Sequence, residues 1–183
     1  MGTTLGRSAT GEHALHLYED EVTLTTTVAS FLSPAFASEQ AIIAIATRAH
    51  LASVEQRLRT VGHDVDDARR SGRYVAIDAE RLLPRLMHNG LPSAEAFKNV
   101  VGAPVAELGG RYGEVRAFGE LVQLLWREGK STAALHLEDL WNELLGYAPL
   151  SLICGYRVRT IGGHEGPRVD EIVRRHRTMP PRD

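Results

Sequence analysis

Six consecutive residues, Ala41 to Ala46 (AIIAIA), constrain the fold of this 183-residue chain more than any other stretch. All six are apolar, so both of the faces that a β-strand presents by alternation would have to be buried. A strand that is buried on both faces is typical of a parallel sheet with helices on either side. The segment therefore predicts an α/β fold in which this strand lies inside the sheet.

The rest of the chain alternates between short apolar runs and segments with helical periodicity. Further strands are predicted at His13 to Tyr18, Tyr74 to Ile77, Val115 to Phe118 and Leu150 to Gly155. Helices are predicted at about 19–32, 50–61, 80–88 and 93–104, on both sides of Gly129, and after Pro167; Pro104 is expected to kink or end its helix. Strands that alternate with helices predict an α/β three-layer sandwich with a mainly parallel central sheet. We expect one domain over residues 12–179, with a flexible arm at 1–11 and a tail at 180–183.

The composition excludes several classes of protein. There are 21 basic and 23 acidic residues, a formal net charge of −2, so the chain lacks the strong positive field that attracts nucleic acid or an anionic membrane. The single cysteine excludes an internal disulfide and a zinc site built from several cysteines. No stretch approaches the roughly 20 apolar residues that a membrane span needs, and the N-terminus has no apolar signal core. We therefore expect a cytoplasmic location.

The segment Gly129-Lys130-Ser131-Thr132 resembles part of a phosphate-binding loop, but the motif is incomplete. The loop requires a first glycine five residues before Gly129, and that position holds Leu124 inside a predicted helix. Gly129 is better explained as the end of one helix and Ser131 as the cap of the next. The position after the first strand, where such a loop belongs, holds acids at Glu19 to Glu21, which would repel phosphate.

A polar site is instead predicted where the parallel strands end, since ligands of such sheets usually bind at the carboxyl ends of the strands. Arg116 lies in the middle of an apolar strand, and a buried arginine requires a partner. Glu120, Asp78 and Glu138 are candidate partners for Arg116. A structural ion pair, or an edge strand that exposes the side chain, is as plausible as a ligand contact. The predicted ligand-binding residues are Tyr18, Glu19, Arg48, His50, Asp78, Arg116, Glu120, Glu138 and Tyr156.

Neither a catalytic residue nor a cofactor is predicted. The sequence contains no H-E-x-x-H and no G-x-S-x-G motif, and His13 and His16 would point to opposite faces of their strand. Cys154 lies in an apolar strand, and His176 continues an apolar helical stripe, so both are expected to be packing residues. We therefore expect no metal, although a site assembled from residues far apart in the sequence stays open.

The chain resembles the MEDS domain, a sensory domain named for methanogen proteins and for the dichloromethane-response regulator DcmR of methylotrophs. The resemblance extends from His13 to about Pro180. It depends mainly on GEVRAFGELVQLLWREGKSTAALHLEDLWNELL and the following LICGY, supported by HALHLYEDE, AIIAIATRAHLASVEQRL and GRYVAIDAERLLPRLM. It implies a divergent RecA/KaiC-like fold that has lost its phosphate loop, and a role in bacterial signal transduction.

The resemblance also implies a function and partners. Members of the family are often joined to histidine-kinase, anti-sigma or DNA-binding modules and are proposed to sense small hydrocarbon derivatives. No such module is recognisable in this sequence, so we expect a non-catalytic sensor that acts on a signalling protein in trans, such as a histidine kinase, an anti-sigma factor or a transcription regulator. The alternatives are a residual nucleotide-dependent or carboxylate-based hydrolase, with Asp78 and Glu120 as acid and base, and a ligand-free interaction module, such as a homodimer.

Overall fold

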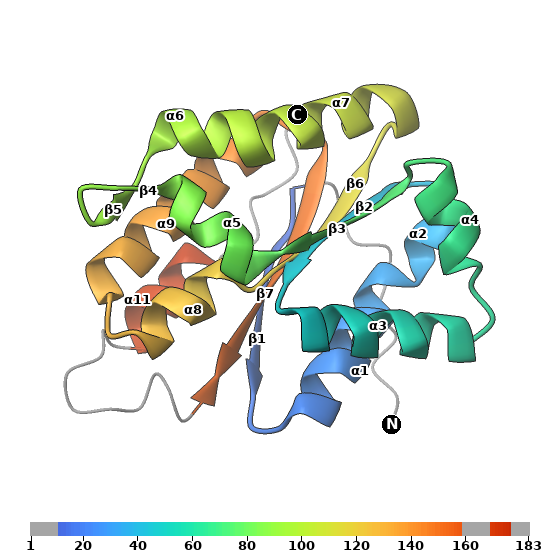
Figure 1. The fold of residues 1–183 in the computed structure, drawn as a ribbon, viewed down its shortest axis with the longest axis horizontal. Helices are drawn as coiled ribbons and strands as arrows, with labels where there is room; N and C mark the ends of the chain where they lie inside the picture. The colour runs from blue at the N-terminus through green and yellow to red at the C-terminus, as the bar shows by residue number, and fades with distance from the viewer. Residues whose placement is uncertain (1–10, 159–168, 177–183) are drawn as a thin grey trace.

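The computed structural model describes residues 11–158 and 169–176, which form an α/β three-layer sandwich (Figure 1). Within these residues the central sheet has five parallel strands in the order β1-β7-β6-β2-β3. The strands are β1 (His13–Tyr18), β2 (Ala41–Ala46), β3 (Tyr74–Asp78), β6 (Val115–Gly119) and β7 (Leu150–Arg157). The predicted fold class is therefore confirmed. The predicted arm and tail fall outside the described residues, except for Gly11.

Helices cover both faces of this sheet, as Figure 1 shows. One face carries α1 (Glu21–Leu32), α2 (Pro34–Ala37), α3 (Arg48–Thr60) and α4 (Val65–Arg70). The other face carries α5 (Ala79–Leu86), α6 (Ala94–Phe97), the π-helix η1 (Lys98–Gly102), α7 (Ala103–Tyr112), α8 (Leu121–Arg127), α9 (Ser131–Leu145) and α11 (Val169–Arg175). Two hydrophobic cores result, one on each side of the sheet.

β2 lies inside the sheet, as its apolar sequence predicts. Its six residues are at most 1% exposed, and it pairs with β3 on one side and with β6 on the other. Ile43 and Ile45 contribute to one core, and Ile42 contributes to the core on the opposite face. A strand with no polar side chain is thus completely buried, because both of its faces are covered by helices.

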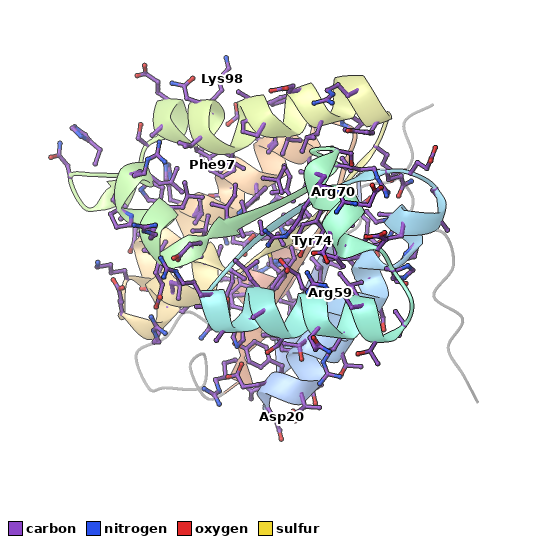
Figure 2. The ribbon with its side chains drawn as sticks, turned by 45° about the vertical axis from the view of Figure 1, so that its right-hand side comes forward. Asp20, Arg59, Arg70, Tyr74, Phe97 and Lys98 are labelled. Carbon is purple, nitrogen blue, oxygen red and sulfur yellow. The ribbon has the colours of Figure 1, made fainter. Side chains whose placement is uncertain are left out.

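Local signals set the ends of several helices. Asp20 caps α1, because its side chain accepts a hydrogen bond from the backbone N–H of Thr23 at 2.8 Å; Figure 2 shows Asp20 at the rim of the molecule. Ser93 caps α6 in the same way through Ala96. Gly129 follows α8 with a φ of 73°, which agrees with its predicted role as a helix end.

Three local predictions were wrong. Pro104 does not end its helix, because it occupies the first turn of α7, where a missing N–H is tolerated, directly after the π-helical turn of η1. Ser131 is the first residue of α9 and makes no capping bond. The segment expected to continue helix α5 to His88 instead forms a small hairpin of β4 (Met87–His88) and β5 (Leu91–Pro92).

The helix that contains η1 still packs as an amphipathic element. In Figure 2 Phe97 points toward the sheet, whereas its neighbour Lys98 points away from the protein. Phe97 is 4% exposed and meets the ring of Trp141 edge to face, with 5.1 Å between the ring centroids. This contact fixes the helix over the core formed by α9 and the sheet.

Candidate functional site

The helices that follow the parallel strands β2 and β6 lie on opposite faces of the sheet, and this leaves an opening at the carboxyl ends of the two strands. β2 and β6 are neighbours in the sheet, but the helix that follows β2 lies on one face and the helix that follows β6 lies on the other. Two adjacent strands whose following helices diverge leave a crevice between their ends, which is where open α/β sheets bind ligands.

Glu120 lies at this point, directly after β6. It is 2% exposed, and one of its carboxylate oxygens accepts a hydrogen bond from the backbone N–H of Thr47 at 2.9 Å. The other oxygen lies 2.6 Å from Nδ1 of His50. Since Thr47 and His50 belong to the start of α3, the carboxylate of Glu120 joins the ends of β2 and β6 across the crevice.

His50 extends this link to the first helix. Its Nε2 contacts the carboxylate of Glu21 at the start of α1, and the other Glu21 oxygen lies 3.6 Å from the guanidinium of Arg157. Burial opposes a positive charge on the ring, but the hydrogen bond and the charge of Glu120, together with the charge of Glu21, outweigh burial and raise the pKa of His50. The imidazolium form is favoured because it can donate from both ring nitrogens to the two carboxylates.

A pocket of about 470 Å³ opens onto this chain of charges. Its walls come from the ends of β1 and β7, from the first turns of α1 and α3, and from α8 with the residue before it. The lining residues are Tyr18, Glu21, Thr47, His50, Glu120, Gln123, Leu124, Arg127 and Arg157. We call this the strand-end pocket. Burial, followed by the charges of Glu120 and Glu21, raises the pKa of Tyr18, so its phenol stays protonated and can act as a hydrogen-bond donor.

A second hollow is less suited to recognition. It measures about 270 Å³ and lies between α1 and α3, away from the strand ends. Its one charged lining residue, Arg57, donates through Nε to the hydroxyl of Thr25 at 2.8 Å. The strand-end pocket has several converging charged and polar groups, and it is therefore the better candidate.

The structure brings together only part of the predicted set. Tyr18, His50 and Glu120 line the strand-end pocket. Glu19 is exposed beside it and does not belong to the lining. The sequence reasoning missed Glu21, Arg127 and Arg157. Glu21 and Arg157 each lie next to a strand end, so the register of parallel strands was the signal that could have identified them.

Arg48 and Asp78 form a pair at the neighbouring strand end. Nε of Arg48 lies 2.7 Å from Asp78, whose other oxygen accepts hydrogen bonds from the backbone N–H groups of Glu80 and Arg81. The hydrogen bond with Arg48 and these N–H groups lower the pKa of Asp78. Asp78 is thus the cap of α5.

Arg116 lies away from the pocket, on the sheet face beneath α1. It is 5% exposed, its Nε donates to Gln40 at 2.9 Å, and a second guanidinium nitrogen donates to the backbone carbonyl of Phe31 at 3.1 Å. In the described part of the chain, Arg116 forms no salt bridge with Glu120, Asp78 or Glu138. The side-chain amide of Gln40 also contacts Glu114, so a carboxylate stabilises the charge indirectly. The predicted ion pair was therefore wrong, and neutral oxygen acceptors bind the guanidinium instead.

Glu138 and Tyr156 belong to a separate buried cluster on the other face of the sheet, with His13, Cys154 and His176. Glu138 is completely buried and accepts a hydrogen bond from the Tyr156 hydroxyl. Burial opposes its charge, but the facing rings of His176 and His13 and the Tyr156 hydroxyl outweigh burial and lower the pKa of Glu138. These two predicted ligand-binding residues therefore do not reach the strand-end pocket.

Comparison with known proteins identifies the family. The model of the MEDS domain, described as "MEthanogen/methylotroph, DcmR Sensory domain", matches residues 12–177. The chain belongs to the MEDS family. The resemblance drawn from the sequence is therefore confirmed over nearly the whole chain, and membership suggests a sensory or regulatory role. A search of the curated proteins found no match to this MEDS domain.

The described residues of the MEDS domain contain no helix that combines the length and the apolar character needed to cross a bilayer. The described site lies at the rim of the sheet, where α1, α3 and α8 begin. Since the position after β1 carries the cap Asp20 and the paired Glu21 in place of glycines, the crevice presents carboxylates where a phosphate loop would present N–H groups.

Proposed function

We propose that this MEDS domain is a non-catalytic sensor that binds a small polar organic molecule in the strand-end pocket and signals to a separate protein. The observation that supports this most is the bridge from Glu120 through His50 to Glu21. It connects β6, α3 and α1 at the point of the sheet where ligands usually bind. A ligand that competes for His50 would alter how these elements are held together.

The lining determines the chemistry of the ligand. Arg127, Arg157 and the charged ring of His50 suit a carboxylate or another small anion, and Glu21 and Glu120 suit hydrogen-bond donors such as hydroxyl groups. An unsubstituted hydrocarbon would leave these groups desolvated and unpaired, which is unfavourable. We therefore favour a hydrocarbon derivative with at least one charged or hydroxyl group, of a size that fits about 470 Å³.

Signalling follows from the position of Glu21 in the first turn of α1. Glu21 is half exposed and is held by His50 on one side and by Arg157 on the other. A ligand anion that pairs with Arg157 or His50 would displace the Glu21 carboxylate and change the position of α1. Such a ligand shifts the balance between two conformations only by its difference in affinity for them. A kinase, anti-sigma factor or transcription regulator would then recognise one of the two.

A hydrolase has less support. A general acid needs a pKa raised toward neutrality, whereas the pKa of Asp78 is lowered, and both of its oxygens are occupied by Arg48 and by the start of α5. Glu120 is likewise engaged by Thr47 and His50. Turnover of ATP, GTP or simple esters by purified protein, lost in Asp78→Asn, would favour a hydrolase over a sensor.

A ligand screen tests the proposal. The purified chain would be heated with short-chain carboxylates, hydroxy acids, alcohols, halogenated hydrocarbons and inorganic phosphate, and the unfolding midpoint recorded. A ligand that binds the folded state raises the midpoint by an amount that grows with the logarithm of its concentration relative to its Kd. We expect hits among carboxylates or hydroxy acids, with the increase lost in His50→Gln and kept in His88→Gln, an exposed histidine of the β4–β5 hairpin. Hits whose effect is equal in both variants would contradict the pocket.

A further inference from the structure

Four ionisable side chains from four different elements converge on one point on the α9 side of the sheet. They are His13 of β1, Glu138 of α9, Cys154 of β7 and His176, which follows α11. One ligand atom of each lies within 4.8 Å of the other three, and all four residues are buried. Charged and polar groups are rarely fully buried together unless something compensates them.

The separations match those around a tetrahedral metal ion. Nε2 of His13 lies 3.3 Å from Sγ of Cys154 and 3.4 Å from a carboxylate oxygen of Glu138, and Nε2 of His176 lies 3.3 Å from the other oxygen of Glu138. Bonds of about 2.0–2.3 Å from zinc to nitrogen, oxygen and sulfur place tetrahedral ligands about 3.3–3.6 Å apart. The His13–Cys154 and His13–Glu138 separations thus already have the required length, and His176 lies at that distance from the second oxygen of the same carboxylate.

Both histidine rings are held with Nε2 directed at the centre of the cluster. Nδ1 of His13 lies 2.9 Å from the side-chain oxygen of Asn142, and Nδ1 of His176 lies 2.7 Å from the backbone carbonyl of Ile172. An oxygen acceptor at Nδ1 fixes the proton there and leaves the Nε2 lone pair free to bind. Metal-binding histidines are almost always oriented by such a bond at their other nitrogen. The Asn142 amide is itself held by a bond to the carbonyl of Arg175 at 3.0 Å.

The cluster has more acceptors than donors. Nε2 of His176 and one oxygen of Glu138 are buried without a hydrogen-bond partner in the described residues. A divalent cation would satisfy both. Together with the Cys154 thiolate and the Glu138 carboxylate, it would also make the site electrically neutral, which removes the cost of burying an uncompensated charge.

We infer that His13, Glu138, Cys154 and His176 form a closed binding site for a divalent transition metal, with zinc as the best fit. Two imidazoles, one carboxylate and one thiolate are ligands that zinc accepts at four-coordinate sites. Four protein ligands leave no open position, so the role is structural. The ion would join the first strand of the sheet to α9, β7 and the last described helix. When the metal binds, the Cys154 thiol releases its proton to the buffer and the thiolate bonds to the metal.

The contrasting arrangement is a buried ion pair between a protonated His176 and Glu138, without a metal. The two arrangements differ in spectroscopy as well as in stability. Cobalt(II) in a tetrahedral site with a thiolate gives a thiolate-to-metal charge-transfer band and intense visible bands, neither of which an ion pair can produce. The inference does not depend on a ligand in the strand-end pocket, because none of these four residues lines that pocket.

The experiment uses the purified full-length chain, stripped with a chelator and titrated with cobalt(II) and then with zinc. We expect one equivalent of metal per chain, a charge-transfer band that zinc abolishes, and proton release in calorimetry. Saturating zinc should raise the unfolding midpoint by at least about 5 °C. Cys154→Ala, a conservative change for a buried thiol, should abolish the charge-transfer band while circular dichroism stays native. Asn142→Ala should weaken zinc binding about 10- to 100-fold, because it frees the His13 ring.

His88→Gln serves as the matched control and should bind zinc as the unmodified chain does, since His88 is exposed in the hairpin. A stripped chain that shows no charge-transfer band with cobalt and no change in midpoint with zinc would overturn the inference in favour of the ion pair. Visible cobalt bands and a metal affinity that are unchanged in Cys154→Ala would overturn it as well, because Cys154 would then not be a ligand.

Discussion

The carboxylate of Glu120 accepts a hydrogen bond from the backbone N–H of Thr47 at 2.9 Å and so connects the carboxyl ends of β6 and β2. This bond crosses the point where the helices after the two strands diverge to opposite faces. It places an almost completely buried negative charge at the bottom of the strand-end pocket. His50 and Glu21 then continue this series of charged groups to the start of α1, and several predictions depend on this arrangement.

The stability of the fold should depend on pH through His50. The pKa of His50 is raised in the folded state. Its contribution to the free energy of unfolding is therefore fully present below the histidine pKa of the unfolded chain, about 6.5, and is lost as pH rises through the raised folded value. Below pH 6, His50→Gln should therefore cost about 1 kcal/mol, after allowance for solvent screening of a partly exposed pair. Urea unfolding between pH 5.5 and 8.5 measures this.

The control is His88→Gln, which removes an exposed histidine of the β4–β5 hairpin. Its difference from the unmodified chain should be small at every pH in the series. A His50→Gln difference that stays constant, or grows with pH, would show that the imidazolium bridge does not form.

Arg116 should matter for stability and not for recognition. Arg116→Met removes the donors to Gln40 and to the carbonyl of Phe31 and leaves both partly buried acceptors without them, which should cost about 2–3 kcal/mol. Ligands that bind the strand-end pocket should keep their affinity within about twofold, since Arg116 is not part of its lining. Arg111→Met, at an exposed position of α7, should change stability by less than about 0.5 kcal/mol. A loss of ligand affinity in Arg116→Met but not in Arg111→Met would show that Arg116 takes part in ligand binding.

Two adjacent glycines of α7 should respond in opposite directions to the same substitution. A Cβ added at Gly109 would lie 2.6 Å from Cγ of Pro149, whereas one added at Gly110 would meet nothing within 4 Å. Gly110→Ala should therefore stabilise the protein by about 0.5–1 kcal/mol through helix propensity. Gly109→Ala should destabilise it by about 1–3 kcal/mol through overpacking. Chemical unfolding of both variants measures the contrast, and equal effects would mean that α7 does not press on Pro149.

The fold was predictable from the sequence where the pattern was strong and local. An all-apolar strand such as Ala41 to Ala46 can be accommodated only inside a covered sheet. The β4–β5 hairpin was missed although the dipeptide Asn89-Gly90 is a strong turn signal in the sequence. Both residues adopt a positive φ in the structure. The flanking strands are only two residues long, so their alternation was too short to recognise.

The sites were harder to predict because they are assembled from distant residues. Tyr18, His50 and Glu120 do line one pocket, since each lies at or shortly after a strand end and parallel strand ends meet at one rim, while their binding of a ligand stays a prediction. The buried cluster was missed, because 163 positions separate His13 from His176 and no local spacing links them. A signal was present nonetheless: Glu138 and His176 each occupy a place on an apolar helical stripe, where a polar residue needs a buried partner.

The most direct test of the proposed sensor is the affinity of its best ligand, measured by isothermal titration calorimetry against Glu120→Gln. This substitution keeps the shape of the side chain and an oxygen for the N–H of Thr47 but removes the charge that holds His50 protonated. Glu107→Gln, which removes an exposed carboxylate on α7, is the control. We predict that Glu120→Gln changes the Kd at least about 10-fold, equivalent to about 1.4 kcal/mol, while the control leaves it unchanged. Equal Kd values for both variants and the unmodified chain would contradict recognition at the strand-end pocket.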